Sequence, residues 1–196
     1  MRQGPGLIWI CVFVFSASFL FTPQSLKAQA TPAAFKQGEI SFFGAYSRVS
    51  TDYGAQKDNG AIFGADYTRF MHFFLTPTLE LRGKIATGPN VNQRTWGGGI
   101  RAGHRFRRFY PYMDFLVSAG TIQFNHPFID SRGKPYASDN SIVYSAGGGV
   151  DYDITRRFAA RFDYQFEHWN LGTTQTLTPQ ALSIGAVYHL SSHNRE

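Results

Sequence analysis

The segment Ser141–Trp169, SIVYSAGGGVDYDITRRFAARFDYQFEHW, decides the expected fold, because its side chains alternate in character on both sides of a short turn at Asp153–Arg157. After the turn, large apolar side chains alternate with polar ones: Phe162, Tyr164 and Phe166 against Arg161, Asp163, Gln165 and Glu167. A period of two predicts β-strands. The polar face carries too many opposite charges to be only solvated surface. We therefore favour a membrane-barrel hairpin, with lipid outside and a polar interior, over two strands of a soluble sandwich.

The first thirty residues predict a secretory signal peptide. Arg2 precedes an apolar run at Leu7–Phe21, and Ala28-Gln29-Ala30 supplies the small-x-small pattern at which signal peptidase cleaves. The alternative is a transmembrane anchor, which needs about 20 apolar residues, and this run is shorter. We expect a signal peptide at 1–30, a periplasmic lead-in at 31–38, a barrel at 39–190 and a short tail at 191–196. Cleavage removes Arg2 and Lys27, which lowers the net charge from +6 to +4.

The mature chain offers few ways to span a membrane. The single cysteine, Cys11, lies in the N-terminal apolar run, so no disulfide is expected after export. No later segment approaches 18 continuous apolar residues. A mature chain that spans a membrane must therefore do so as a closed barrel, because every backbone polar group in lipid needs an internal partner.

Alternation along the rest of the chain predicts an all-β fold, an eight-stranded antiparallel up-and-down transmembrane β-barrel. The quoted segment supplies two strands, and the others are expected at Glu39–Arg48, Gly60–Phe70, Pro77–Ala86, Arg94–Arg105, Tyr110–Phe124 and Pro179–Leu190. The connections after odd-numbered strands are expected to be longer, which places them outside the cell and both termini in the periplasm. The longest, Asn125–Asp139, contains aromatic residues, so it is either a ligand-binding or adhesive loop or a passive one.

A repeated four-residue motif, which we call the glycine repeat, supports this register. Four even-numbered strands carry a similar segment: Gly64-Ala-Asp-Tyr67, Gly99-Ile-Arg-Ala102, Gly149-Val-Asp-Tyr152 and Gly185-Ala-Val-Tyr188. Aligning the glycines directs each one inward and directs Tyr67, Tyr152 and Tyr188 outward near the periplasmic ends, where an aromatic girdle is expected. We also place Trp169, beside His168, in the girdle at the outer end. Chance recurrence in a Gly- and Tyr-rich chain is the alternative.

The same register directs a set of charged side chains into the barrel. These candidates for ion pairs in the lumen are Asp66, Glu80, Arg82, Lys84, Arg101, Asp114, Asp151, Arg161, Asp163 and Glu167. An eight-stranded barrel is only wide enough for side chains to fill, and unpaired buried charges are costly. We therefore favour a structural plug of ion pairs over a gated ion path.

Basic residues gather at the expected periplasmic turns. They are Arg69, Arg105, Arg107, Arg108, Arg156 and Arg157. They either contact anionic phospholipid head groups of the inner leaflet or are simply solvated turn charges. Nucleic-acid binding explains them poorly, because they lie on short turns of an exported protein.

His168 is the only candidate for catalysis that the sequence offers. A membrane-facing histidine with a nearby serine is the arrangement of a lipid A deacylase, which works by the triad of nucleophile, base and acid. Such enzymes usually place the serine two residues after the histidine, and here that residue is Asn170. No histidine pair has metal-ligand spacing. We therefore expect no catalytic residues, no metal and no cofactor.

Three segments carry a resemblance to a known family. Gly147-Gly-Gly-Val-Asp-Tyr152, Arg161-Phe-Asp-Tyr164 and the closing strand at Leu182–Leu190 resemble small bacterial outer-membrane β-barrel proteins, the OmpA/OmpX-like, porin-family barrel domains. The resemblance implies a location in the lipid bilayer of the bacterial outer membrane and biogenesis by the barrel assembly machinery. That machinery favours a terminal aromatic residue, whereas here Leu190 is followed by six more residues. We expect a non-enzymatic role in envelope integrity or surface interaction; the alternatives are a narrow porin-like channel and, more remotely, a lipid-modifying enzyme.

Overall fold

A computed structural model describes residues 38–52, 57–70, 74–129, 133, 135–172 and 176–190 of the chain. The predicted signal peptide, almost all of the predicted lead-in and the tail at 191–196 lie outside the described residues.

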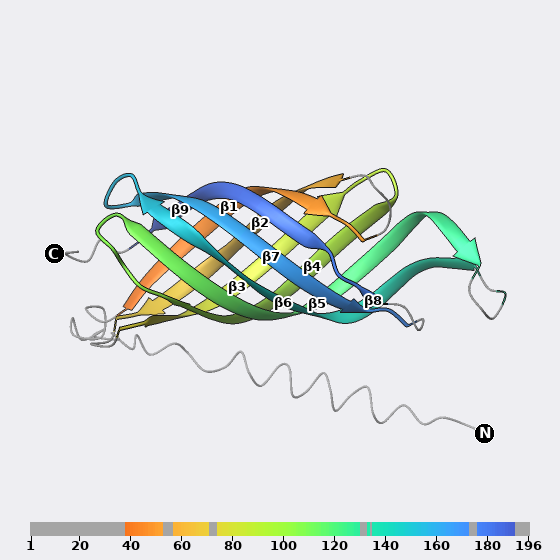
Figure 1. Cartoon of the computed structure of the whole chain (residues 1–196), viewed down its shortest axis with the longest axis horizontal. Coiled ribbons are helices and arrows are strands. Elements are labelled where there is room, and N and C mark those ends of the chain that lie inside the picture. Colours follow the sequence, from red (N-terminus) through yellow and green to blue (C-terminus); the bar gives the residue numbers. More distant parts are fainter. Residues whose placement is uncertain are drawn as a thin grey trace, which may run out of the picture. The chain divides into compact units, whose positions relative to one another are not determined.

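The described residues form one closed antiparallel sheet, and the predicted eight-stranded barrel is confirmed (Figure 1). The strands are β1 (Gly38–Ser50), β2 (Lys57–Arg69), β3 (Thr76–Thr87), β4 (Val91–Gly103), β5 (Phe109–Ile129), β6 (Pro135–Asp153), β7 (Phe158–Asn170), β8 (Thr176–Leu177) and β9 (Gln180–His189). The short β8 pairs with the end of β7, and β9 is the eighth strand of the barrel. Closure comes from β9, which pairs with both β1 and β7, while β6 pairs with β7. The described ranges contain no helix long and apolar enough to span a membrane.

Burial alternates along most of each strand, and it alternates without a break over residues 110–120 of β5. Tyr112, Asp114 and Leu116 are buried there, whereas Met113 and Phe115 between them are exposed. Because successive side chains of a strand point to opposite faces, the exposed Pro111 lies on the same outer face as Met113 and Phe115.

The exposed face of the barrel is a belt of large apolar side chains. Leu79, Leu81, Ile100, Met113 and Leu182 are each more than 60% exposed, although they would be buried in a soluble sheet. A closed barrel with an apolar exterior and charged side chains inside has the build of an outer-membrane barrel, since lipid covers the first and the strands enclose the second. The chain is therefore a transmembrane β-barrel of the bacterial outer membrane.

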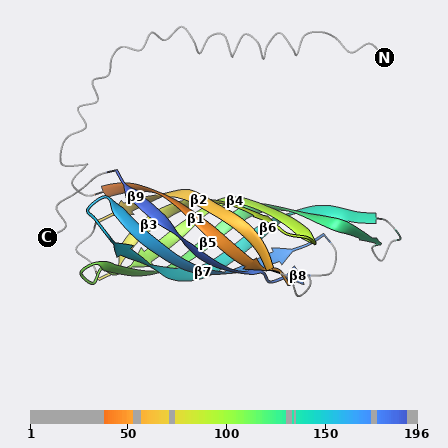
Figure 2. The same ribbon diagram turned by 90° about the horizontal axis from the view of Figure 1, so that it is seen from above.

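The two ends of the barrel differ. At the turn end lie the last residues of β2, β4 and β6, the first residues of β3, β5 and β7, and the two ends of the described chain, where the Leu190 amide donates to the Ile40 carbonyl. At the ribbon end, β5 and β6 continue beyond the neighbouring strands as a two-stranded ribbon (Figures 1 and 2). The expected long loop at Asn125–Asp139 is thus wrong in extent: β5 runs to Ile129 and β6 begins at Pro135, with a register shift between Gln123 and Phe128. The polar residues of this segment do not end the strands, because the ribbon extends beyond the apolar belt and needs no apolar face there.

The four glycines of the glycine repeat occur where the structure leaves no room for a side chain. A Cβ atom added to Gly64, Gly99, Gly149 or Gly185 would come closer than 3.0 Å to a backbone carbonyl oxygen of the following strand around the barrel. Those carbonyls belong in turn to β3, β5, β7 and β1. The recurrence therefore marks four places, one on every second strand, where neighbouring backbones approach too closely for a side chain, as glycines in barrel strands often do.

Candidate functional site

The ten charged residues predicted for the lumen all lie inside the barrel, each with no more than 9% of its surface exposed. They comprise six carboxylates and four cations, contributed by β2 to β7. Eight of them form one connected network, and Lys84 and Glu167 form a separate pair closer to the ribbon end.

Arg82 is the centre of the network. From β3 its Nε lies 2.5 Å from Glu80 Oε1, and its two terminal nitrogens lie 3.2 Å from Asp114 Oδ2 and Asp163 Oδ1. Because β3 and β7 lie on opposite sides of an eight-stranded barrel, the contact with Asp163 crosses the whole lumen. Gln165 Nε2 donates to Asp114 Oδ1 over 2.7 Å, and this bond ties β7 to β5 at the same height.

Two further arginines serve the half of the network nearer the turn end. Asp66 and Glu80 face each other across β2 and β3, so two like charges meet, and Arg101 donates to both of them. Arg161 donates from Nη2 to Asp66 Oδ2 over 2.9 Å and from Nε to Asp151 Oδ1 over 2.7 Å. Carboxylates that would repel one another are thereby held by shared guanidinium groups, whose fork geometry suits two acceptors.

Aromatic rings complete the walls around these arginines. The guanidinium of Arg101 lies 4.0 Å from the ring centroid of Tyr112, and that of Arg161 lies 4.4 Å from the centroid of Phe43. Tyr112 also donates its hydroxyl hydrogen to Asp163 Oδ2 over 2.9 Å. A desolvated cation over a ring face gains about 2 kcal/mol, so the arginines are held by packing as well as by charge.

Trp169 corrects a prediction, because it lies inside the lumen rather than in the outer girdle. Its side chain is fully buried, and its Nε1 donates to Glu167 Oε2 over 3.0 Å. The same carboxylate holds Lys84, whose Nζ lies 2.5 Å from Glu167 Oε1. The indole is placed inside because Trp169 has the same parity along β7 as Glu167, and its N–H finds an acceptor there.

Trp169 belongs to an apolar cluster that fills the lumen at the ribbon end. Its buried members come from five strands and one connection: Val91, Ile122, Phe124, Val143, Trp169, Leu171 and Leu177. Two layers of different chemistry thus occupy the lumen, an ion-pair layer nearer the turn end and an apolar layer at the ribbon end.

The lumen contains groups that the sequence analysis did not select. Tyr112 and Gln165 belong to the network; alternation places Gln165 on the polar face of its strand, but the predicted ion-pair set contains only charged residues. At the turn end, His189 Nδ1 lies 2.6 Å from Glu39 Oε1 and 2.9 Å from Ser41 Oγ, with all three residues buried. These partners lie 148 or more positions apart in the chain, so no local pattern predicts their meeting.

The outward residues are distributed as follows. Tyr67 is 45% exposed, and Tyr152 and Tyr188 lie on the outer face near the turn end, where they pair across strands with Phe109 and Phe158. His168 is exposed on β7 opposite Tyr144, whereas Glu167 points into the lumen. Arg105, in the connection between β4 and β5, forms an ion pair with Asp153, the last residue of β6.

Metal binding finds no support in this arrangement. Within the ranges that the structure describes, no three His, Cys, Asp or Glu side chains are grouped as metal ligands.

Comparison with known proteins gives a likeness of fold. No family model matches the chain, and no curated protein matches it. Among solved structures, Neisserial surface protein A is similar with a TM-score of 0.52 and 18% identity, over 77% of this chain and 96% of that one. The N-terminal β-barrel domain of Pseudomonas aeruginosa OprF has a TM-score of 0.48, with 14% identity over 79% of this chain and 100% of that one. The outer membrane enzyme PagL has a TM-score of 0.46, with 8% identity over 74% and 98%. The chain therefore has the fold of the small eight-stranded outer-membrane barrels. This is the fold that the resemblance of segments 147–152, 161–164 and 182–190 implied.

Proposed function

We propose that this chain is a non-enzymatic outer-membrane barrel that supports envelope integrity and offers its ribbon end for surface interaction, with a lumen sealed by ion pairs. The observation that carries this proposal is Arg82, whose guanidinium spans from β3 to Asp163 on the opposite wall. A buried cation with three carboxylate partners is costly to displace. An ion that passes would have to break these contacts and then cross the apolar layer around Trp169.

A narrow channel is the alternative function. The six carboxylates among the ten predicted lumen residues outnumber the four cations. Such a surplus favours cations over anions in any path that opens. The two functions differ in whether the network stays closed.

Planar-bilayer recording of the purified, folded barrel separates them. We expect no steady conductance from the natural chain. R82A and W169A each weaken one of the two layers and should stay closed, whereas R82A/W169A weakens both and should leak. R156Q, which changes an exposed turn arginine, is the control for altered charge. Steady conductance from the natural chain would favour the channel and overturn the sealed lumen.

The geometry argues against the lipid-modifying enzyme. The carboxylate next to His168 is bonded to Lys84 inside the lumen and cannot orient that histidine. The buried His189, Ser41 and Glu39 at the turn end do not form a catalytic triad either. Both Ser41 and Glu39 contact Nδ1 of His189, whereas a triad places the serine and the acid on opposite ring nitrogens. An altered lipid A composition in cells that carry H168A or S41A in place of the natural chain would contradict the non-enzymatic proposal.

A further inference from the structure

A groove on the lipid-facing surface, close to the turn end, is the feature that the sealed-lumen function does not use. It has a volume of about 560 Å³ and lies across β2, β3, β4 and β5. Its outward-facing lining consists of Tyr67, Arg69, Pro77, Leu79, Ile100, Ala102, Met113 and Phe115. Ligand sites usually measure about 300–1,000 Å³, so the groove is large enough for a small molecule or one chain of a lipid.

Strand register explains why the surface is hollow at this place. Pro77 and Ala102 are paired across β3 and β4, and they form a low floor. One step deeper into the membrane, Leu79 and Ile100 are paired across the same two strands and stand more than 60% exposed. Met113 is paired with Ala102 and closes the side toward β5. Small residues surrounded by large ones leave a depression that a flexible hydrocarbon chain would fill.

A cation marks the end of the groove that faces the membrane surface. Arg69 is the last residue of β2 and lines the groove. Its partner on β1 is Gly38, which has no side chain to cover Arg69. The Tyr67 hydroxyl lies over Gly38 as well, within 3 Å of the place where a Cβ on that glycine would be. Arg69 and Tyr67 thus both line the groove at this edge, and a guanidinium and a hydroxyl are donors suited to a phosphate.

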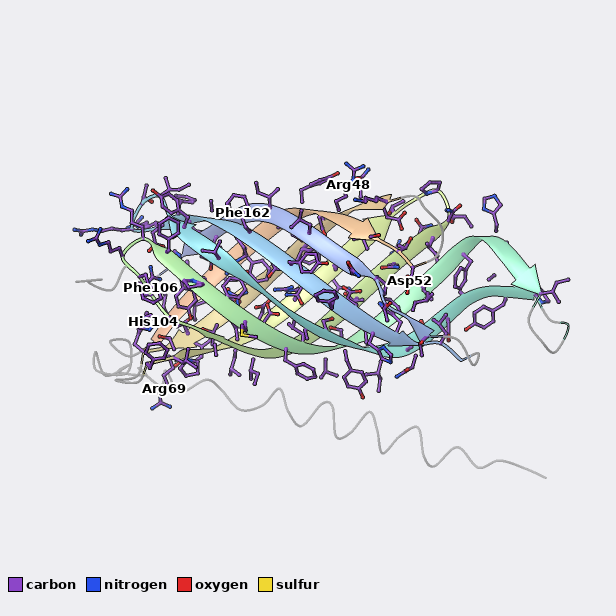
Figure 3. The ribbon with its side chains drawn as sticks, viewed as in Figure 1. Arg48, Asp52, Arg69, His104, Phe106 and Phe162 are labelled. Carbon is purple, nitrogen blue, oxygen red and sulfur yellow. The ribbon has the colours of Figure 1, made fainter. Side chains whose placement is uncertain are left out.

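An aromatic group lies at the same level as the cation. His104 stacks on Phe74 with ring centroids 4.4 Å apart, and Phe106 packs edge-on against His104, also at 4.4 Å. Arg69, His104 and Phe106 lie at one end of the barrel in Figure 3, and Arg48 and Asp52 lie at the other. Aromatic side chains collect at membrane–water interfaces, so the edge with Arg69 is at head-group depth and the floor is at acyl-chain depth.

We propose that this groove binds a single glycerophospholipid with an anionic head group, its acyl chain over Pro77 and Ala102 and its phosphate at Arg69 and Tyr67. The turn end, with its turns and both ends of the described chain, is the end that faces the periplasm in outer-membrane barrels, so the lipid comes from the periplasmic leaflet. Charge complementarity favours this occupant over a protein, because an apolar interface would leave Arg69 without a partner at its edge. The site is independent of whether the lumen conducts.

Native mass spectrometry of the complete barrel tests the proposal with two probes of equal chain length, phosphatidylglycerol and phosphatidylcholine. The natural chain should retain one phosphatidylglycerol in preference to phosphatidylcholine. A102F fills the floor and should lose both lipids, whereas the matched control A61F adds the same ring to another outward alanine of the lipid-facing surface and should lose neither. R69Q should bind phosphatidylglycerol about fivefold more weakly and keep its phosphatidylcholine binding, and R156Q should change neither.

Each other outcome counts against the site. Equal retention by A102F and the natural chain, or release of all lipid by the natural chain, would overturn it. A dimer that A102F abolishes would assign the groove to a second copy of the chain and overturn the lipid proposal. The R69Q measurement gives an answer by itself if A102F does not fold, because it leaves the groove floor unchanged.

Discussion

At the scale of single residues, Arg161 illustrates what the interior charges contribute. It is paired across the strands with Asp151 on β6, and it reaches Asp66 on β2, three strands away around the barrel. A buried ion pair is weak evidence for net stability, since desolvation offsets much of the attraction, but the loss of one partner leaves an uncompensated charge. The arginine therefore matters most through what its removal would expose.

We expect R161Q to lower the free energy of unfolding by about 3–5 kcal/mol, because Asp151 would lose its nearest cation and Asp66 would keep only Arg101 as a partner. Urea unfolding of the barrel in lipid vesicles measures this change. R156Q, at an exposed turn position, should stay within about 0.5 kcal/mol of the natural chain. D151N/R161Q should recover part of the loss, and an equal or larger loss in that double variant would argue against the pairing.

The two tryptophans of the described chain differ in their surroundings. Trp96 is 57% exposed on the lipid-facing surface, where its ring lies 4.9 Å from that of Phe63, whereas Trp169 is fully buried in the lumen. Lipids brominated on their acyl chains quench only indoles that they can touch. Variants that keep one tryptophan each, with Trp9 also replaced, should therefore show strong quenching for Trp96 and almost none for Trp169. Equal quenching of the two tryptophans would indicate that Trp169 lies in the lipid-facing girdle.

At the scale of elements, glycines occupy regularly spaced close approaches between strands. Gly64, Gly99, Gly149 and Gly185 occupy the close approaches between β2 and β3, β4 and β5, β6 and β7, and β9 and β1. Gly44 on β1 differs, because an added Cβ would meet nothing within 4 Å. Residue type alone therefore does not identify the glycines at which neighbouring strands approach closely.

We expect G99A to cost about 1–3 kcal/mol of stability, because the added methyl group would collide with the Phe115 carbonyl and push β4 from β5. G44A is the matched control on the outer face and should be neutral or slightly stabilising, since it restricts the unfolded chain. Urea titration of both variants in the same vesicles compares them. A neutral G99A would show that the strands can shift apart at this point.

At the scale of the whole molecule, closure depends on the last strand. β9 supplies the only link between β1 and β7 that the described residues show, and without it both of those edges would be open in lipid. Open sheet edges are not tolerated in the hydrocarbon region. The barrel should therefore fold as one cooperative unit.

Electrophoresis in detergent tests this cooperativity. The complete chain should migrate differently before and after boiling, because the closed barrel stays folded in detergent until it is heated. A chain that ends before Gln180 should run at one position in both cases, since it lacks the closing strand. A heat-dependent shift in the truncated chain would mean that seven strands can close without β9.

Much of the fold was predictable because its signal is local. Alternation depends only on the parity of neighbouring residues, so it identified the eight strands, the two faces and the inward direction of the charged residues. The error at Trp169 arose where residue type was preferred to parity: positions 161 to 169 alternate without a break in β7, and parity alone directs Trp169 inward. The ends of the strands were harder, because pairing beyond the membrane does not require apolar residues.

The sequence by itself determined that this chain is an alternating β-barrel with a charged interior, because side-chain parity can be read within short stretches. Only the tertiary structure decided which charge meets which. Arg82 and Asp163 lie 81 positions apart and approach only because closure places β3 opposite β7. The same closure brings His189 to Glu39 and gathers the groove at Arg69 from four strands. Such contacts depend on the diameter and register of the closed sheet, and neither can be read from the sequence of a single strand.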